Sequence, residues 1–190
     1  METFTETLEN GLIAHVEIQP DLDPENPRNE WWDNLGTMVC FHRRYDLGDE
    51  HNLSVEEAKK LAGRKDVISL PLYLYDHSGI TMRTSPFSCP WDSGQVGFIY
   101  VTLEKVRKEY GVKRVSKELR QKVKNILSGE VETYDQYLTG DVWGYDVTVK
   151  DQAGNEVASD SCWGFYGLDY CREAAREVVK YHAEQTAKGA

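Results

Sequence analysis

Alternation of apolar and polar residues is the first clear pattern along the chain. Between residues 11 and 18, Leu12, Ala14, Val16 and Ile18 share one face of an extended segment. A period of two residues is typical of a strand with one buried face. Similar β-rich runs predict further strands at residues 35–45, 66–75, 80–85, 95–102, 141–151 and 156–165. The run at 95–102 is apolar almost throughout, which predicts a central strand buried on both faces.

Turn-forming residues predict that four of these strands form two hairpins. The polar turn at residues 76–79 joins the strands at 66–75 and 80–85, and Gly79 is expected to adopt a positive φ angle there. The turn at residues 152–155 joins the last two strands in the same way.

Helix signals lie between the strands. Ser54 and Glu57 match the S-x-x-E capping box, which predicts a short helix at residues 55–62, ended by Gly63. Further helices are predicted at residues 102–110, at residues 116–138 and after Asp169. The helix at 116–138 carries an apolar stripe at helical spacing, formed by Leu119, Val123, Ile126 and Leu127.

These elements together predict an α+β fold, a mainly antiparallel sheet with three or four helices packed on it. A length of 190 residues is ordinary for one domain, so residues 1–190 are expected to form a single domain around one core. The helix that starts near Ser116 is expected to lie across one face of the sheet. Residues 20–34 combine prolines with Asp and Asn, which predicts an exposed acidic loop.

Composition excludes several classes of protein. Hydrophobic residues make up 40% of the chain and charged residues 28%, a balance typical of a folded globular protein. No apolar run approaches the roughly 20 residues that span a bilayer. The first residues, METFTETLENG, have neither the basic nor the apolar part of an export signal. The sequence therefore predicts a cytoplasmic protein with no membrane partner.

Cysteine spacing gives no support to a disulfide framework or a metal centre. A reducing compartment predicts free thiols for Cys40, Cys89, Cys162 and Cys171. Zinc sites use paired ligands a few residues apart, and the nearest such pair is Cys40 with His42. Packing of Cys40 as a small apolar residue is the favoured interpretation. We therefore expect neither a metal nor another cofactor.

Charge is distributed unevenly along the chain, whose formal net charge is −10. Residues 1–50 carry 12 acidic and 3 basic residues, and residues 128–170 carry 9 acidic residues and 1 basic residue. Residues 101–127 have the opposite balance, with 9 basic and 3 acidic residues. Contact between the acidic segments and nucleic-acid phosphate would be repulsive, so direct nucleic-acid binding is not expected.

All five tryptophans lie in or beside loops rich in Asp, Asn, Gly or Pro. At least two of them are expected to be structural, since tryptophan is mostly buried. Exposed ones flanked by carboxylates would suit recognition of a basic protein surface, where aromatic residues act as binding hot spots. The partner-binding residues predicted on this basis are Asp21, Asp23, Glu25, Glu30, Trp31, Trp32, Trp91, Asp92 and Trp143.

Catalytic motifs are scarce, and the sequence favours a binding protein over an enzyme. There is no phosphate-binding glycine motif and no HExxH zinc motif. His77 and Cys89 are the weak catalytic candidates, because a thiolate beside an imidazole is nucleophilic. The alternative, which we favour, is that Asp76, His77 and Gly79 only form a turn and that Cys89 fills space.

Four long stretches carry a resemblance to a known group of proteins. They are DNLGTMVCFHRRYDLGD, LPLYLYDHSGITMRTSPFSCPWDSGQVGFIYV, GEVETYDQYLTGDVWGY and DSCWGFYG. From about Trp32 to about Tyr170, the chain resembles an uncharacterised family of small acidic proteins encoded by bacteriophages, prophages and other mobile elements. The resemblance implies a bacterial host cell and supplies no assigned reaction.

Three functional hypotheses follow. The first is a counter-defence protein that inhibits a host defence effector or another nucleic-acid-processing protein through an acidic, aromatic surface, by analogy as a DNA mimic. The second is a small-molecule enzyme, or a protein that sequesters a nucleotide in an aromatic and basic pocket. The third is an accessory protein that adjusts host replication or transcription by protein contact.

Overall fold

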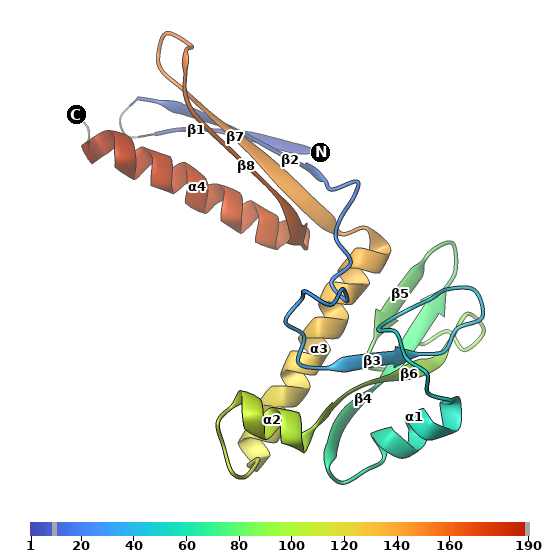
Figure 1. Cartoon of the computed structure of the whole chain (residues 1–190). Coiled ribbons are helices and arrows are strands. Elements are labelled where there is room, and N and C mark those ends of the chain that lie inside the picture. Colours follow the sequence, from blue (N-terminus) through green and yellow to red (C-terminus); the bar gives the residue numbers. More distant parts are fainter. Residues whose placement is uncertain (9–10, 189–190) are drawn as a thin grey trace. The chain divides into compact units, whose positions relative to one another are not determined.

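The computed structural model describes residues 1–8 and 11–188, in which eight strands and four helices form two compact units (Figure 1). Unit 1 comprises Met1–Glu25 and Gly140–Ala190, and unit 2 comprises Asn26–Thr139. Each unit has its own four-stranded antiparallel sheet. The predicted α+β class, with antiparallel strands and four helices, is therefore confirmed.

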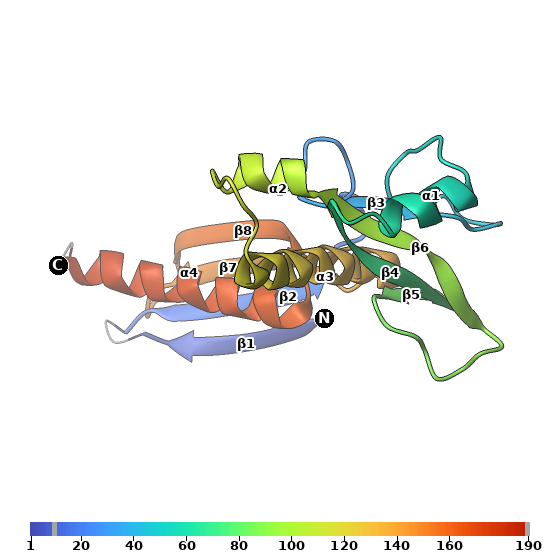
Figure 2. The same cartoon turned by 90° about the horizontal axis from the view of Figure 1, so that it is seen from below.

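Unit 1 is built from the two ends of the chain. Its elements are β1 (Glu2–Thr7), β2 (Ile13–Pro20), β7 (Val142–Lys150), β8 (Glu156–Tyr166) and α4 (Leu168–Lys188), and its strand order is β1-β2-β7-β8. Ala14, Val16 and Ile18 alternate inward along β2 as predicted, and they pack against buried residues of β7 and α4. Helix α4 covers one face of this sheet (Figures 1 and 2).

Unit 2 contains the remaining elements. They are β3 (Thr37–Cys40), α1 (Val55–Ala62), β4 (Val67–Asp76), β5 (Ile80–Arg83), β6 (Ser93–Thr102), α2 (Leu103–Glu109) and α3 (Lys117–Thr139), with strand order β3-β6-β4-β5. Strand β6 is central and α3 packs across the sheet, both as predicted (Figure 2). Residues Ile99 and Val101 of β6 are buried, but Phe98 and Tyr100 are half-buried, so burial on both faces is incomplete.

The single core predicted from chain length is corrected by the structure. Buried apolar residues form two clusters, one in unit 1 and one in unit 2. The physical reason is that β2 pairs with β7, which joins the two ends of the chain and leaves residues 26–139 to form their own sheet and core. Strand patterns do not reveal which strands pair, so this division was not visible in the sequence.

Three local expectations also need correction. Strand β3 ends at Cys40, so Cys40 and His42 do not share the face of a strand. The positive φ angle in the β4–β5 turn belongs to Ser78, at 57°, and not to Gly79. Helix α4 begins at Leu168, which places Asp169 inside its first turn. Within the part of the chain that the structure describes, none of the helices combines the length and the apolar character of a membrane span.

Candidate functional site

The part of the predicted acidic loop that belongs to unit 2 is held in place by its own hydrogen bonds. We call residues 26–34 the Trp31 loop. The Asn26 side chain accepts a hydrogen bond from the backbone of Arg28 at 2.9 Å, and the Asn34 amide donates to the Pro27 carbonyl at 2.8 Å. The backbone of Trp32 donates to the Asn29 carbonyl. These bonds fix the conformation of a segment that has no helix or strand.

The two neighbouring tryptophans of this loop have different environments. Trp31 is 67% exposed, and it lies between Glu30 and Asp33, both of which are exposed as well. Trp32 is half-buried and lines a hollow of unit 2. Of this adjacent pair, Trp31 therefore carries the exposed ring.

A buried arginine anchors the Trp31 loop from within. The Arg28 side chain is only 2% exposed, and its guanidinium donates to both carboxylate oxygens of Asp49 at 2.7 Å. It also donates to Glu130 at 3.1 Å and to the Gly36 carbonyl at 2.9 Å. Burial by itself lowers the pKa of Arg28, but the hydrogen bonds and charges of Asp49 and Glu130 outweigh this effect and raise the pKa.

Helix α3 supplies the polar groups that position the surrounding backbone. Glu130 accepts hydrogen bonds from the backbone of Leu35 at 2.7 Å and of Gly36. One turn later, the Tyr134 hydroxyl accepts from the backbone of Gly48 at 3.0 Å. Together with Arg28, these side chains attach the loop and the segment after β3 to helix α3. Sequence reasoning missed Arg28 and Glu130, because nothing in their local sequence marks them as buried.

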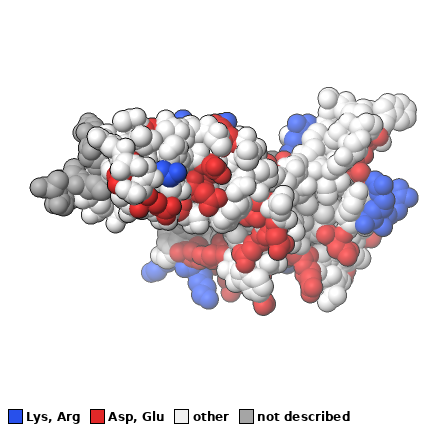
Figure 3. Space-filling model, turned by 90° about the horizontal axis from the view of Figure 1, so that it is seen from above, with Lys and Arg blue, Asp and Glu red and all other residues white. Residues whose placement is uncertain are grey.

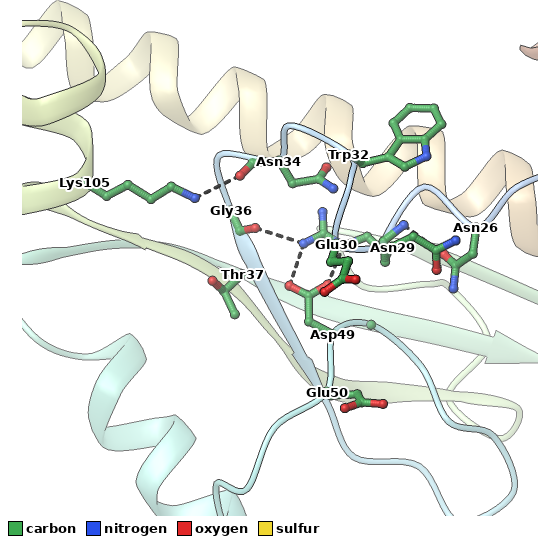
Figure 4. A pocket seen from close by; sticks show the side chains of 12 residues that line it. Asn26, Asn29, Glu30, Trp32, Asn34, Gly36, Thr37, Asp49, Glu50 and Lys105 are labelled. Atoms are coloured by element: carbon green, nitrogen blue, oxygen red, sulfur yellow. Dashed lines mark hydrogen bonds and ion pairs between the residues drawn. The ribbon is translucent and has the colours of Figure 1, made fainter.

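A polar hollow of about 640 Å³ lies beside the Trp31 loop (Figure 4). Its lining includes the carboxylates of Glu30, Asp49 and Glu50. Lys105 reaches from α2 to the Asn34 carbonyl, with Nζ and O 2.9 Å apart. Arg28 neutralises the charge of Asp49. The acidic rim of the hollow therefore comes from Glu30 and Glu50.

A second hollow, of about 1040 Å³, is lined mainly by the segment that follows β3. It shares Asn26, Asp49 and Glu50 with the first hollow, and its aromatic side includes His42 and Tyr45, whose rings stack at 5.1 Å. Basic, acidic and aromatic side chains are therefore mixed in this lining.

The other predicted partner-binding residues occupy separate positions. Trp91 is 91% exposed in unit 2, on the segment that leads into β6, and Asp92 follows it. Trp143 belongs to unit 1, where it packs against the core and donates to Asp141 at 2.6 Å. Trp163 lies over Gly144, where an added Cβ would approach its ring to 2.2 Å. Trp143 thus packs as a structural residue, whereas Trp163 contacts Gly144 and remains 45% exposed.

The acidic residues that precede the Trp31 loop belong to unit 1. Asp23 and Glu25 are exposed and Asp21 is half-buried, so the prediction of an exposed acidic segment holds for most of it. In the view of Figure 3, Asp and Glu side chains form several groups, and Lys and Arg form separate groups. Exposed carboxylates attract basic partners and repel phosphate.

The structure brings His77 and Cys89 to the same carboxylate. In Asp92, Oδ2 lies 3.5 Å from Nδ1 of His77 and 3.6 Å from Sγ of Cys89. In a nucleophilic triad the imidazole lies between the nucleophile and the carboxylate, so that it can accept the proton of the nucleophile. Here the carboxylate lies in the middle, so the imidazole is not placed to accept the thiol proton. This geometry favours the turn interpretation over nucleophilic catalysis.

Neither the thiols nor the acidic and histidine side chains form a metal centre among the described residues. All four cysteines are free thiols. Burial raises the pKa of Cys40 to about 12 and that of Cys171 to about 11, so both thiols stay protonated at neutral pH.

Comparison with known proteins found no relative of this chain. The chain matched no protein-family model, no curated protein and no solved structure.

Proposed function

We propose that the protein binds a basic surface of another protein through the Trp31 loop and the carboxylates beside it. The observation that carries this proposal is the exposure of Trp31 on a segment that is held rigidly by Arg28, Asn26 and Asn34. Because hydrogen bonds already order the backbone that carries Trp31, less conformational freedom is lost when a partner covers the ring. Exposed tryptophans of this kind are frequent hot spots of protein interfaces.

The charges around Trp31 define the chemistry of the partner. Glu30 and Asp33 are exposed residues close to Trp31 in the sequence, and Glu50 lines the adjacent hollow. A lysine or arginine side chain of the partner would enter this polar hollow, while Trp31 packs against apolar surface. Exposed carboxylates contribute mainly to the rate of association, and the buried aromatic contact contributes mainly to the lifetime of the complex.

The biological role we propose is inhibition of a host defence effector or another nucleic-acid-processing protein. Such proteins carry basic surfaces that bind phosphate, and an acidic protein can occupy them as a DNA mimic. This step rests on the resemblance to proteins encoded by phages and mobile elements and on the charge of the chain.

The alternative is a small-molecule site in the second hollow. The stacked pair of His42 and Tyr45, with Arg43 in the same lining, supplies aromatic and basic groups for a nucleotide. Against it stand Asp46 and Glu50, whose charges oppose an anionic ligand. The observation on Trp31 therefore favours the protein-binding proposal.

Capture of a partner from host lysate, followed by kinetics on the purified partner, tests the proposal. Trp31→Ala should increase the dissociation rate and weaken binding by about 2 kcal/mol or more. Reversal of Asp21, Asp23, Glu25 and Glu30 to lysine should mainly slow association, and less so at high salt. Tyr181→Ala is the matched control, because Tyr181 is an exposed aromatic residue of α4 in unit 1.

Two results would contradict this function. One is binding that does not depend on salt and survives Trp31→Ala. The other is saturable binding of a free nucleotide that becomes tighter after the four reversals, because those reversals remove charge that repels an anion. The second result would favour the hollow beside His42 and Tyr45.

A further inference from the structure

A basic surface lies on the helices of unit 2, in a chain that is acidic elsewhere. Residues 101–127 hold nine of the 22 basic residues of the chain but only three of its 32 acidic residues. Most of these basic side chains are exposed on α2, on the connection after it and on the first half of α3. A local excess of positive charge of this kind attracts anionic partners.

Helical geometry arranges three of these bases in one row. Lys117, Arg120 and Lys124 are spaced i, i+3 and i+7 on α3, so their side chains project from one side of the helix. The buried residues Val123 and Leu127 follow Arg120 at i+3 and i+7, so the row borders the packed side of α3. Lys117 and Lys124 are exposed, and Arg120, nearest to the buried residues, is half-buried. Along the axis the row spans roughly 10.5 Å, from a rise of about 1.5 Å per residue. We call these three residues the basic row.

The basic row has no acidic partner within the chain. Among the residues that the structure describes, Lys117, Arg120 and Lys124 form neither an ion pair nor a side-chain hydrogen bond. The fourth basic residue of α3, Lys122, has a partner within the chain, since its Nζ lies over the Tyr110 ring at 5.2 Å from the centroid. The acidic residue of the first turn, Glu118, is not part of the row. The row is therefore available to an external anion.

We propose that the basic row binds the sugar–phosphate backbone of nucleic acid without sequence preference. Duplex DNA carries one negative charge for about every 1.7 Å of its axis, so a row of three bases meets several phosphates at once. The net charge of −10 opposes this contact at long range. Charges separated by more than about 8 Å are screened at physiological salt, so the local row determines the interaction at contact. This surface is distinct from the Trp31 loop and does not depend on the function proposed for that loop.

Fluorescence anisotropy of a labelled DNA duplex of mixed sequence tests this proposal, with the full chain as titrant. The test variant is Lys117→Gln/Arg120→Gln/Lys124→Gln, and glutamine preserves helix propensity. The matched control is Lys59→Gln/Lys60→Gln/Lys65→Gln, which removes three exposed bases from α1 and the turn after it. Both variants change the formal net charge from −10 to −13, so they differ only in the place of the lost charge.

The wild-type chain should bind the duplex at about 50 mM salt and release it as salt rises towards about 200 mM. Loss of the basic row should weaken binding at least about tenfold at low salt. It should also reduce the slope of log K against log salt by about 1 for each base removed. The control should stay within about twofold of the wild type, as expected for bases that do not contact phosphate.

Three outcomes would overturn the proposal. The first is the absence of salt-dependent binding by the wild-type chain. The second is an equal loss of DNA affinity in both variants, because the net charge of the chain, and not the basic row, would then determine binding. The third is self-association of the wild-type chain at low salt, seen by sedimentation velocity and lost in the row variant. That result would assign the row to the acidic surface of a second copy of this chain.

Discussion

The guanidinium of Arg28 and the carboxylate of Asp49 meet in two parallel hydrogen bonds, each 2.7 Å long, inside unit 2. The same Asp49 oxygen that accepts from Nη2 of Arg28 also accepts from the backbone of Met38 at 2.9 Å. The pair thereby ties the Trp31 loop to β3 and to the segment after it. Because all three guanidinium nitrogens of Arg28 donate to protein oxygens, we infer that Arg28 supports the candidate surface by positioning its backbone.

Arg28→Ala is expected to destabilise the protein strongly. Removal of one partner leaves Asp49 and Glu130 as unmatched carboxylates next to buried backbone, which typically costs about 3–5 kcal/mol. Arg64→Ala is the control, because its ion pair with Asp66 is exposed and should contribute little to stability. Urea denaturation measures the free energy of unfolding of both variants. Equal free energies of unfolding for the two variants would show that the Arg28 pair does not hold unit 2 together.

Replacement of two glycines of unit 2 by alanine should change the thermal stability of the protein in opposite directions. A Cβ on Gly97 would approach the Val39 carbonyl oxygen to 1.9 Å, which forces β3 and β6 apart. A Cβ on Gly129 meets no atom within 4 Å, and alanine is the better helix former by about 1 kcal/mol. We expect Gly97→Ala to lower the melting temperature markedly and Gly129→Ala to raise it. Thermal unfolding followed by circular dichroism measures this difference.

The buried thiol of Cys40 should make the stability of the protein fall at alkaline pH. Its pKa rises from 9.0 to about 12 on burial, so above pH 9 the unfolded chain loses a proton that the folded chain retains. This contribution is complete below pH 9 and is lost as the pH rises towards 12, at roughly 1.4 kcal/mol per pH unit. Cys40→Ala should flatten this part of the profile in urea titrations. An unchanged slope would show that Cys40 does not titrate differently in the two states.

Thiol labelling should separate the cysteines by exposure. Cys162 is exposed on β8, whereas Cys171 is buried beneath the same sheet and its pKa is raised to about 11. An aromatic disulfide reagent at neutral pH should therefore modify Cys162 quickly and Cys171 only after unfolding. Cys162→Ser should remove the fast phase. Rapid reaction of Cys171 in the folded protein would contradict its position in the core of unit 1.

Cys89→Ser tests the catalytic interpretation directly. Since Asp92 lies between Cys89 and His77, we expect this variant to retain partner binding and biological activity. His77→Ala should behave in the same way, because neither side chain carries the proposed interface. Loss of activity in both variants, with unchanged melting temperature and partner affinity, would favour an enzyme.

The sequence by itself determined the features that depend on near neighbours. Ser54 and Glu57 form the predicted capping box, and both of its reciprocal hydrogen bonds are present. Ala14 and Val16 face the core as the period of two residues requires. Such contacts lie within a few residues along the chain, so spacing and residue type are sufficient to predict them.

Only the tertiary structure decided how distant segments combine. The pairing of β2 with β7 divides the chain into two cores, and it brings Gln19 to within 3.1 Å of Asp146. The burial of Arg28 depends in the same way on Asp49 and on Glu130, which lies 102 residues further along the chain. The exposure of Trp31 follows from this arrangement. A local pattern contains no information on which distant carboxylate or strand lies nearby, because burial and charge pairing are settled only when the segments pack together.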